Sequence, residues 1–170
     1  MSAPVPSPDT TTIPSLSDKC GLLPAFTVKV QIRPTAALGD GHCGIFASEK
    51  IISGTKIWEW TDLITRHHFS ELGELLSKMK DRSEAQLFLR QGFVMPDDET
   101  YFCSNPKDAG RFINHSIDSN INLNGAMRDI EAGEELLMNY SFHGDPEWYQ
   151  EICKVYGVLT EAQIAEGQQD

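Results

Sequence analysis

Two stretches near the C-terminal end decide the fold of this chain: GRFINHSIDSNINLNG (Gly110–Gly125) and RDIEAGEELLMNYSF (Arg128–Phe142). The first carries an Asn-His-Ser triplet that begins at Asn114, and the second carries an Asn-Tyr-Ser triplet that begins at Asn139. Between the triplets, short apolar pieces alternate with turn residues, and Ala-Gly-Glu-Glu marks the last turn. This ordered pair of polar triplets is the feature of the sequence that bears most directly on function.

The composition is that of one globular domain. The chain has 170 residues, of which 40% are hydrophobic and 23% charged, so it is large enough to bury a real core. No apolar run approaches the roughly 20 residues that span a bilayer, and the N-terminus lacks the basic start and apolar run of a secretory signal. We therefore expect an intracellular protein, nuclear or cytoplasmic, without a membrane segment.

The net charge of −11 indicates which class of partner the chain can bind. It argues against direct nucleic-acid binding, because phosphates select basic protein faces. It suits a basic partner, such as a peptide rich in lysine and arginine that is steered to an acidic surface. Solubility alone is the other explanation of the acidic charge.

The cysteines are scattered as Cys20, Cys43, Cys103 and Cys153, with neither a Cys-x-x-Cys pair nor the spacing of metal ligands. We therefore predict reduced and mostly buried thiols. A metal role for Cys43 and its neighbour His42 lacks partner ligands at matching spacing, so we predict no metal there.

The first part of the chain is expected to form a flexible leader followed by strands. Residues 1–20 combine prolines with Ser and Thr and have little to bury. From Phe26 to Ile32, apolar and polar residues alternate, which predicts a half-buried strand that Pro34 ends. The stretch Lys50–Trp60 predicts a strand, a Ser-Gly turn and a second strand.

The period of the pattern then changes to that of helices. Between residues 62 and 91, apolar residues recur at spacings of three and four, which predicts a helical insert of two or three short helices. These residues are Leu72, Leu75, Leu76, Met79, Ala85, Phe88 and Leu89. Residues 146–156 predict a closing helix that Asp145 caps and Gly157 ends, followed by a tail at 159–170. Together the elements predict an irregular, β-rich α+β domain.

The two triplets, in this order, resemble the signature of the SET domain, the lysine methyltransferase fold that uses S-adenosylmethionine. In that family the Asn-His-Ser segment is threaded under a loop that carries a motif ending in Tyr. The resulting pseudoknot forms the cofactor pocket and one end of the lysine channel. The resemblance implies a SET domain over 21–158, without the cysteine-rich segment that precedes it in many histone-directed members.

On this resemblance, separate pieces of the chain hold S-adenosylmethionine. The backbone of His42, Cys43 and Gly44 takes its amino-acid moiety, and His42 stands where the family usually has a glycine. Asn114 binds the same moiety, and His115 holds the adenine edge mainly through its backbone. Taken alone, the glycine-rich turn that ends at Gly44 is a weak pattern that favours a plain hairpin turn.

The resemblance also gives Trp148 a role. Some SET enzymes close the cofactor pocket with a C-terminal helix whose aromatic side chain stacks on adenine, and Trp148 is the residue that suits this. Ordinary packing of the helix on the core is the other explanation. Many members instead use a zinc-bound cysteine tail, whose fourth ligand is a Cys directly after Asn-His-Ser. Ile117 stands in that place, and the tail is missing, so we predict no zinc.

Tyr140 occupies the place of the family's catalytic tyrosine. A lysine amine is nucleophilic only when neutral, and its ordinary pKa is about 10.4. A narrow apolar channel that faces a sulfonium lowers that pKa through desolvation and charge repulsion. Positioning for in-line methyl transfer then dominates the rate gain, and no strong general base is required at the channel floor. His115 and Ser116 do not make a hydrolase pair, because adjacent side chains rarely meet as base and nucleophile.

Four side chains are expected to line the lysine channel. The resemblance places Trp60 where the family typically has Tyr, and it places Leu123, Met138 and Phe142 around the catalytic residue. A core tryptophan on a strand is the other explanation of Trp60. Neither Leu123 nor Met138 offers a hydroxyl to anchor a water beside the amine, so we expect products beyond monomethyl-lysine.

These features predict an S-adenosylmethionine-dependent protein-lysine N-methyltransferase that acts on a basic protein or peptide, with histones among the candidates. The acidic-leaning helical insert forms one wall of the peptide groove in this hypothesis, unless its charges merely solvate a helix face. Two alternatives stay open: an inactive SET-like module that binds cofactor or peptide, and an oligomeric scaffold. A homodimer that completes the groove is also compatible with the sequence.

Overall fold

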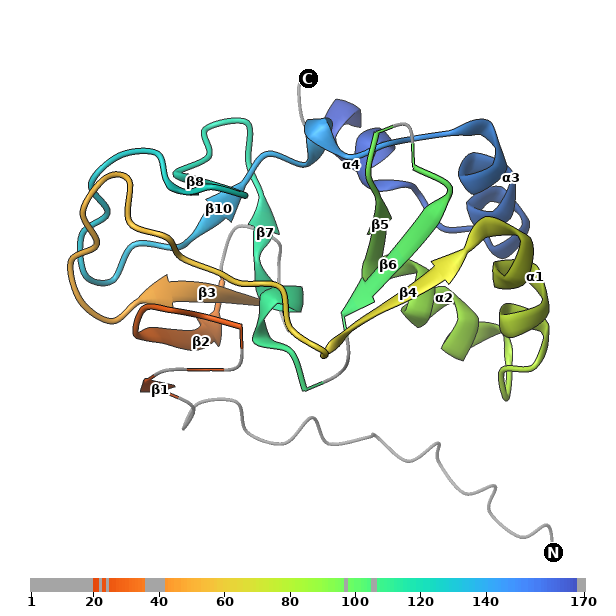
Figure 1. The fold of residues 1–170 in the computed structure, drawn as a ribbon, viewed down its shortest axis with the longest axis horizontal. Coiled ribbons are helices and arrows are strands. Elements are labelled where there is room, and N and C mark those ends of the chain that lie inside the picture. Colours follow the sequence, from red (N-terminus) through yellow and green to blue (C-terminus); the bar gives the residue numbers. More distant parts are fainter. Residues whose placement is uncertain are drawn as a thin grey trace, which may run out of the picture.

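The computed structural model describes residues 20–21, 23, 25–35, 42–96, 98–104 and 107–167. Within these ranges, three small sheets and four α-helices form an irregular α+β fold (Figure 1), which confirms the fold class expected from the sequence. The expected leader, apart from its last residue, and most of the glycine-rich turn lie outside the described residues.

The first sheet is antiparallel, and its strands lie in the order β1 (Cys20–Gly21), β2 (Val30–Pro34) and β3 (Cys43–Ala47). Val30 of β2 lies opposite Ala47 of β3. Because side chains alternate between the two faces of a strand, Val30 and Ile32 of β2 enter the core together, as do Ile45 and Ala47 of β3.

The expected strand starts later than the alternation in sequence indicates. Phe26 does not belong to β2 but forms an isolated bridge with Trp58. A positive φ of 73° at Ala25 turns the chain just before this bridge. The expected strand pair at 50–60 is likewise reduced to isolated bridges around a turn, because its two halves pair with different segments.

The second sheet has the order β7 (Asn114–His115), β10 (Leu137–Met138), β8 (Ile121–Asn122) and β9 (Gly125–Ala126). β10 runs parallel to both of its neighbours, so a strand from late in the chain lies between two earlier ones. This insertion is the crossing that the resemblance implied. It brings the segments of the two polar triplets side by side (Figure 1).

The third sheet is antiparallel with the order β4 (Ile64–His68), β6 (Thr100–Ser104) and β5 (Gly92–Val94). Two helices, α1 (Phe69–Ser77) and α2 (Arg82–Arg90), connect β4 to β5. The expectation of two or three short helices in this part of the chain is therefore confirmed.

The insert does not begin with a helix, although the expected range began at residue 62. Ile64–His68 forms strand β4, in which β-branched Ile64 and Thr65 pair with β6. The helical pattern starts only at Leu72, and the preceding His68 caps α1 by accepting a hydrogen bond from the backbone N–H of Ser70.

The helix α3 (Glu147–Tyr156) follows the second sheet near the C-terminal end. Its left-handed end at Gly157, with φ of 70°, agrees with the expected stop. The expected cap by Asp145 is wrong, because Pro146 takes the capping position and α3 has no side-chain cap. Proline has no N–H and a φ suited to the start of a helix, so it can begin α3 without a capping carboxylate.

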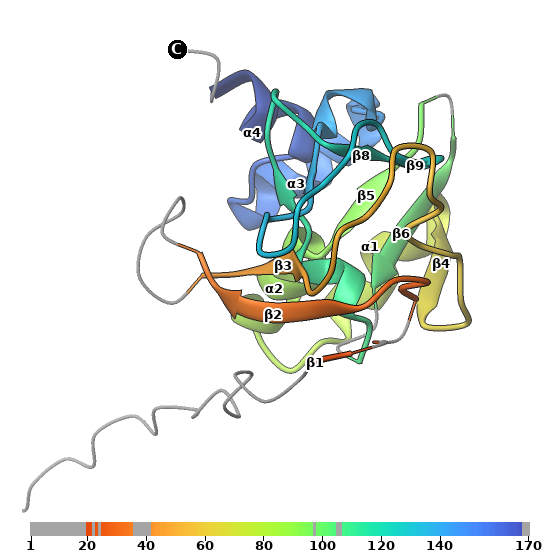
Figure 2. The same cartoon turned by 90° about the vertical axis from the view of Figure 1, so that its left-hand side faces the viewer.

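Two hydrophobic clusters form the core. The first joins the first two sheets around Val30, Ile45 and Ile130. The second packs α1, α2 and α3 on the third sheet, with Tyr101 and Tyr149 almost fully buried. Figure 2 shows β1 and β2 at the opposite side of the molecule from α3. The seven apolar residues of the expected helical faces all belong to the second cluster or pack against it.

Buried ionisable groups make this core sensitive to alkali. Cys103 and Cys153 are buried thiols outside any disulfide, as predicted, and Cys43 is a half-buried one. Burial raises the pKa of the Cys103 and Cys153 thiols to about 11. It also raises the pKa of the Tyr101 and Tyr149 phenols well above their ordinary value.

We expect the free energy of unfolding to fall between about pH 9 and about pH 11. The unfolded chain releases these protons at lower pH than the folded chain, so the stabilisation is complete below the ordinary pKa values and is lost as the pH rises through the raised ones. Urea unfolding at both ends of this range measures the loss. Cys153→Ala should make the fall shallower, and a stability independent of pH across this range would contradict the account.

Candidate functional site

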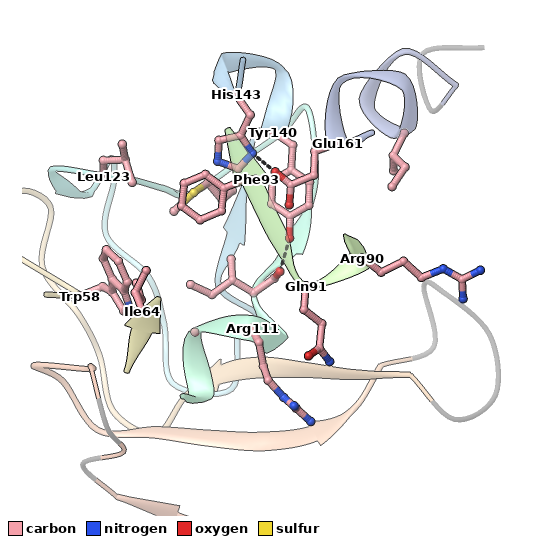
Figure 3. A pocket seen from close by; sticks show the side chains of 14 residues that line it. Trp58, Ile64, Arg90, Gln91, Phe93, Arg111, Leu123, Tyr140, His143 and Glu161 are labelled. Carbon is pink, nitrogen blue, oxygen red and sulfur yellow. Dashed lines mark hydrogen bonds and ion pairs between the residues drawn. The ribbon is translucent and has the colours of Figure 1, made fainter. Parts of the chain in front are cut away.

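A cavity of about 140 Å³ lies beside Tyr140 (Figure 3). Part of its wall comes from the first triplet's segment and from β10, which contribute Ile113 and Met138. Another part comes from β5 and from a C-terminal helix, α4 (Glu161–Gly167), which contribute Phe93 and Glu161. Distant parts of the chain therefore meet around one tyrosine.

Tyr140 is fixed from two sides by the segment of the first triplet. Its backbone N–H donates to Nδ1 of His115 at 2.9 Å, and its hydroxyl donates to the carbonyl oxygen of Ile113. Both contacts follow from the parallel pairing of Met138 with His115, since Tyr140 lies two residues further along. Burial, reinforced by the charge of Glu161, raises the pKa of Tyr140 far above the ordinary range. The phenol therefore stays protonated and serves as a neutral dipole.

His115 holds this arrangement through its ring. The side chain is buried, and burial lowers its pKa, which leaves a neutral imidazole whose Nδ1 accepts the hydrogen bond from Tyr140. Its Nε2 is enclosed without a hydrogen-bond partner among the described residues. Trp58 Nε1 and Arg111 Nε, from two residues of the cavity wall, are likewise enclosed donors without a partner in the described structure.

A polar network joins the first sheet to the second. Asn114 Nδ2 donates to the carbonyl oxygen of Cys43 at 3.1 Å and to Oε1 of Glu135 at 2.7 Å. The other carboxylate oxygen of Glu135 accepts from Thr35 Oγ1 at 2.9 Å. A Cβ atom at Gly44 would lie 2.0 Å from Glu135 Oε1, so only glycine fits there without a shift. The predicted residues Cys43, Gly44 and Asn114 are thus brought together.

The structure separates the residues expected in the channel into two groups. Leu123 and Met138 line the cavity with Tyr140. Trp60 does not, since it is 44% exposed and lies against Trp58, whose ring centroid is 4.9 Å away. Phe142 packs against the first core cluster. Trp58 takes the wall position, and because both tryptophans point to one side of an extended segment, the sequence alone offered no way to choose between them.

None of the six residues expected to bind the cofactor is part of this cavity wall. His42 is exposed at the start of β3. Trp148 packs on the second core cluster, with its ring centroid 5.9 Å from that of Phe69, and it is absent from the cavity wall. The described geometry thus favours the packing explanation of Trp148, and its contact with adenine stays a prediction.

The residues that sequence reasoning missed come mainly from the end of the chain. The segment after residue 158 was expected to be a tail, yet it contains α4, which brings Glu161 to the cavity. A signal for this helix is present in the sequence: Thr160 Oγ1 accepts from the backbone N–H of Gln163, and Gln163 Oε1 accepts from that of Thr160. This reciprocal pair is a capping box. His143 and Phe93 also line the cavity.

Within the described residues there is no group of three or more His, Cys, Asp or Glu side chains that could hold a metal ion. The absence of zinc stays a prediction. None of the helices in the described ranges is long and apolar enough to cross a membrane.

The SET-domain family model matches residues 42–141, which is more than half of the chain. The chain therefore belongs to the SET-domain family. The matched range contains both polar triplets and the strands that pair them.

Solved structures of Polycomb Repressive Complex 2 share the fold. A humanized mutant of the Chaetomium thermophilum complex bound to an inhibitor matches with a TM-score of 0.51 at 22% identity, over 73% of this chain and 16% of that one. The complex in an autoinhibited conformation bound to S-adenosylmethionine gives 0.51 and 24%, over 77% and 17%. A complex with trimethylated and mutant forms of histone H3 gives 0.50 and 25%, over 69% and 15%.

The chain matches only about one sixth of each of these longer chains. No curated protein sequence matches it. The comparisons therefore establish the family and the fold.

Gly44→Ala should lower the free energy of unfolding by about 1–3 kcal/mol. The new methyl group displaces the Glu135 carboxylate, which then loses its hydrogen bonds to Asn114 and Thr35. Gly73→Ala is the matched control, because Gly73 is an exposed residue of α1 with open space around it, and this change should stabilise the helix. Urea denaturation of both variants measures the difference, and equal stabilities would refute the packing argument.

Proposed function

We propose that this protein is an S-adenosylmethionine-dependent protein-lysine N-methyltransferase. The observation that carries the proposal is the placement of Tyr140, whose backbone N–H and hydroxyl are both held by the Asn-His-Ser segment at the edge of the cavity. A protonated, immobile phenol in this position can orient an amine and a methyl group for in-line transfer. Membership of the SET-domain family supports this chemistry.

The residues around the cavity fit S-adenosylmethionine in kind. Trp58 Nε1 and Arg111 Nε are enclosed donors of the cavity wall without partners in the described structure, so a polar ligand with acceptor groups would satisfy them. Asn114 Nδ2 donates a hydrogen bond to the carbonyl oxygen of Cys43, and it can donate instead to the amino-acid moiety of S-adenosylmethionine. When bound, the cofactor supplies an electrophilic methyl group on a sulfonium centre.

The cavity wall prepares the substrate amine. Leu123, Met138 and Trp58 give the space beside Tyr140 a partly apolar wall. Desolvation disfavours the charged form of an amine, so the pKa of a lysine that enters this space falls. The phenol of Tyr140 stays protonated and donates its hydrogen bond to the Ile113 carbonyl oxygen. This bond and the surrounding packing hold the phenol oxygen in one position.

The substrate class follows from charge. The chain carries a net charge of −11, which favours a basic protein segment over an acidic one. One similar solved structure is a complex with histone H3. We therefore propose a lysine in a basic protein segment as the substrate, and histones are the first proteins to test.

An inactive SET-like binding module is the second candidate function. The observation that favours it is that none of the residues expected at the cofactor, Trp148 and His42 among them, is part of the cavity wall. A module of this kind binds cofactor or peptide without turnover, so cofactor affinity and methyl transfer must be measured separately.

Tyr140→Phe should reduce methyl transfer by about 100-fold, because the hydroxyl that orients the reacting groups is lost. Transfer of radiolabelled methyl groups to core histones and to a whole-cell extract measures the effect. Tyr156→Phe is the matched control, since Tyr156 packs on the second core cluster, away from the cavity wall. If neither wild type nor control transfers label while S-adenosylmethionine still binds, the inactive-module function replaces the proposed one.

Exhaustive reaction should yield di- or trimethyl-lysine, since Leu123 and Met138 leave the cavity wall without a hydroxyl at their positions. Leu123→Tyr should shift the product toward monomethyl-lysine, because the larger ring narrows the cavity. Met127→Tyr, at an exposed residue outside the cavity wall, should leave the products unchanged. Mass spectrometry distinguishes these outcomes, and only monomethyl product from the wild type would contradict the prediction.

A further inference from the structure

A buried histidine–carboxylate pair lies in the cavity next to Tyr140. His143 Nδ1 lies against a carboxylate oxygen of Glu161, and the two side chains are only 6% and 17% exposed. Both residues line the cavity (Figure 3). They come from different elements, the turn after Tyr140 and helix α4, and neither takes part in the role of Tyr140.

The His143 ring is held in a single orientation by aromatic neighbours. It stacks on Phe93 with centroids 4.5 Å apart and an interplanar angle of 15°, and on Tyr140 at 5.4 Å and 28°. Phe142 meets it edge-on at 4.2 Å. An imidazole clamped in this way can present a nitrogen to a ligand without losing further conformational freedom.

The two ring nitrogens have different surroundings. Nδ1 faces Glu161, whereas Nε2 has no hydrogen-bond partner among the described residues and is not one of the fully enclosed polar atoms. Figure 3 shows this second nitrogen on the side of the ring away from Glu161. Nε2 is therefore the nitrogen that a group inside the cavity can reach.

Glu161 completes a pattern that stabilises a protonated imidazole. Burial raises the pKa of its carboxyl group, and the contact with His143 opposes this rise. A buried carboxylate is costly unless it is paired, so the site gains most when the imidazole beside it carries a positive charge. A carboxylate on one ring nitrogen with the other nitrogen free is the arrangement by which enzymes orient a histidine base.

We propose that His143 accepts the proton of the substrate's lysine ammonium and that Glu161 positions the ring for this step. The proposal rests on the proposed function. The proton moves from the ε-ammonium group to Nε2, which leaves a neutral amine with a free electron pair. This pair forms the new N–C bond to the methyl carbon as the C–S bond breaks, and the electron pair of that bond stays on sulfur. The imidazolium then releases its proton to solvent.

The groups that face His143 are few. Glu161 approaches from α4, Tyr140 from the same turn, and His115 from β7. Arg90 and Arg111 line the same cavity. Glu161 is therefore the carboxyl group in direct contact with the His143 ring.

The pH dependence of single-turnover methyl transfer to core histones tests the proposal in His143→Asn and Glu161→Gln. With its base removed, His143→Asn should react about 100-fold more slowly near pH 7. The rate of this variant should then rise about tenfold per pH unit up to about pH 9, because solvent must take the lysine proton instead. Glu161→Gln keeps the shape of the side chain and should show a smaller loss in the same direction. His67→Asn and Glu166→Gln are the matched controls outside the cavity wall and should follow the wild-type profile.

A second readout does not depend on turnover. In protein labelled with ¹⁵N-histidine and saturated with S-adenosylhomocysteine, a histone H3 tail peptide should convert the His143 ring to its doubly protonated form. A peptide with norleucine in place of lysine should not do so. Calorimetric affinity for S-adenosylmethionine should stay within about threefold of wild type in both variants, since His143 and Glu161 act on the amine.

The outcomes separate this inference from the proposed function. Parallel pH profiles in wild type and His143→Asn, together with an unchanged ring spectrum, would overturn the role of His143 and leave the methyltransferase intact. Transfer that is absent from wild type at every pH would overturn both. A uniform loss in Glu161→Gln with no change in the pH profile would show that Glu161 only supports the fold of α4.

Discussion

The parallel insertion of β10 between β7 and β8 is the constraint on which the site depends. Two-residue strands hold few hydrogen bonds, so the insertion needs further support, and the buried side chain of Asn120 gives it. Its amide donates to the carbonyl of Glu135 at 2.8 Å and accepts from the N–H of Leu137 at 2.9 Å. A buried amide without a hydrogen-bond partner is energetically costly. These two hydrogen bonds therefore fix the register of β10 and, through it, the position of Tyr140.

A second constraint links this crossing to the first sheet. The Glu135 carboxylate lies between Asn114 and Thr35, against a position where only glycine fits. Each bond in such a network is strengthened by the low dielectric of its surroundings, and each missing partner costs more there than at the surface. The network therefore joins the first sheet to the second and leaves room only for glycine at position 44.

The sequence permits prediction of those parts of the fold that local pattern and ordered motifs determine. The helical faces around Leu72 and Leu89 follow from their spacing, and the stop at Gly157 follows from its backbone freedom. The pairing of the two triplets follows from resemblance. By contrast, the choice of Trp58 over Trp60, and the meeting of His143 with Glu161, depend on tertiary contacts between distant segments. Spacing along the chain contains no information on such contacts. The capping box at Thr160, however, does predict a helix at α4.

The cavity meets two physical demands that oppose each other. Apolar walls favour a neutral amine, yet they also make it costly to remove the proton to water. A histidine base inside the cavity resolves the conflict only if the carboxylate beside it has a partner before the substrate enters, since an isolated buried carboxylate would protonate instead. Glu161 and His143 meet this condition, and they do so from two elements that meet only when α4 packs on the turn after Tyr140. The C-terminal helix is therefore part of the site's chemistry as well as of its wall.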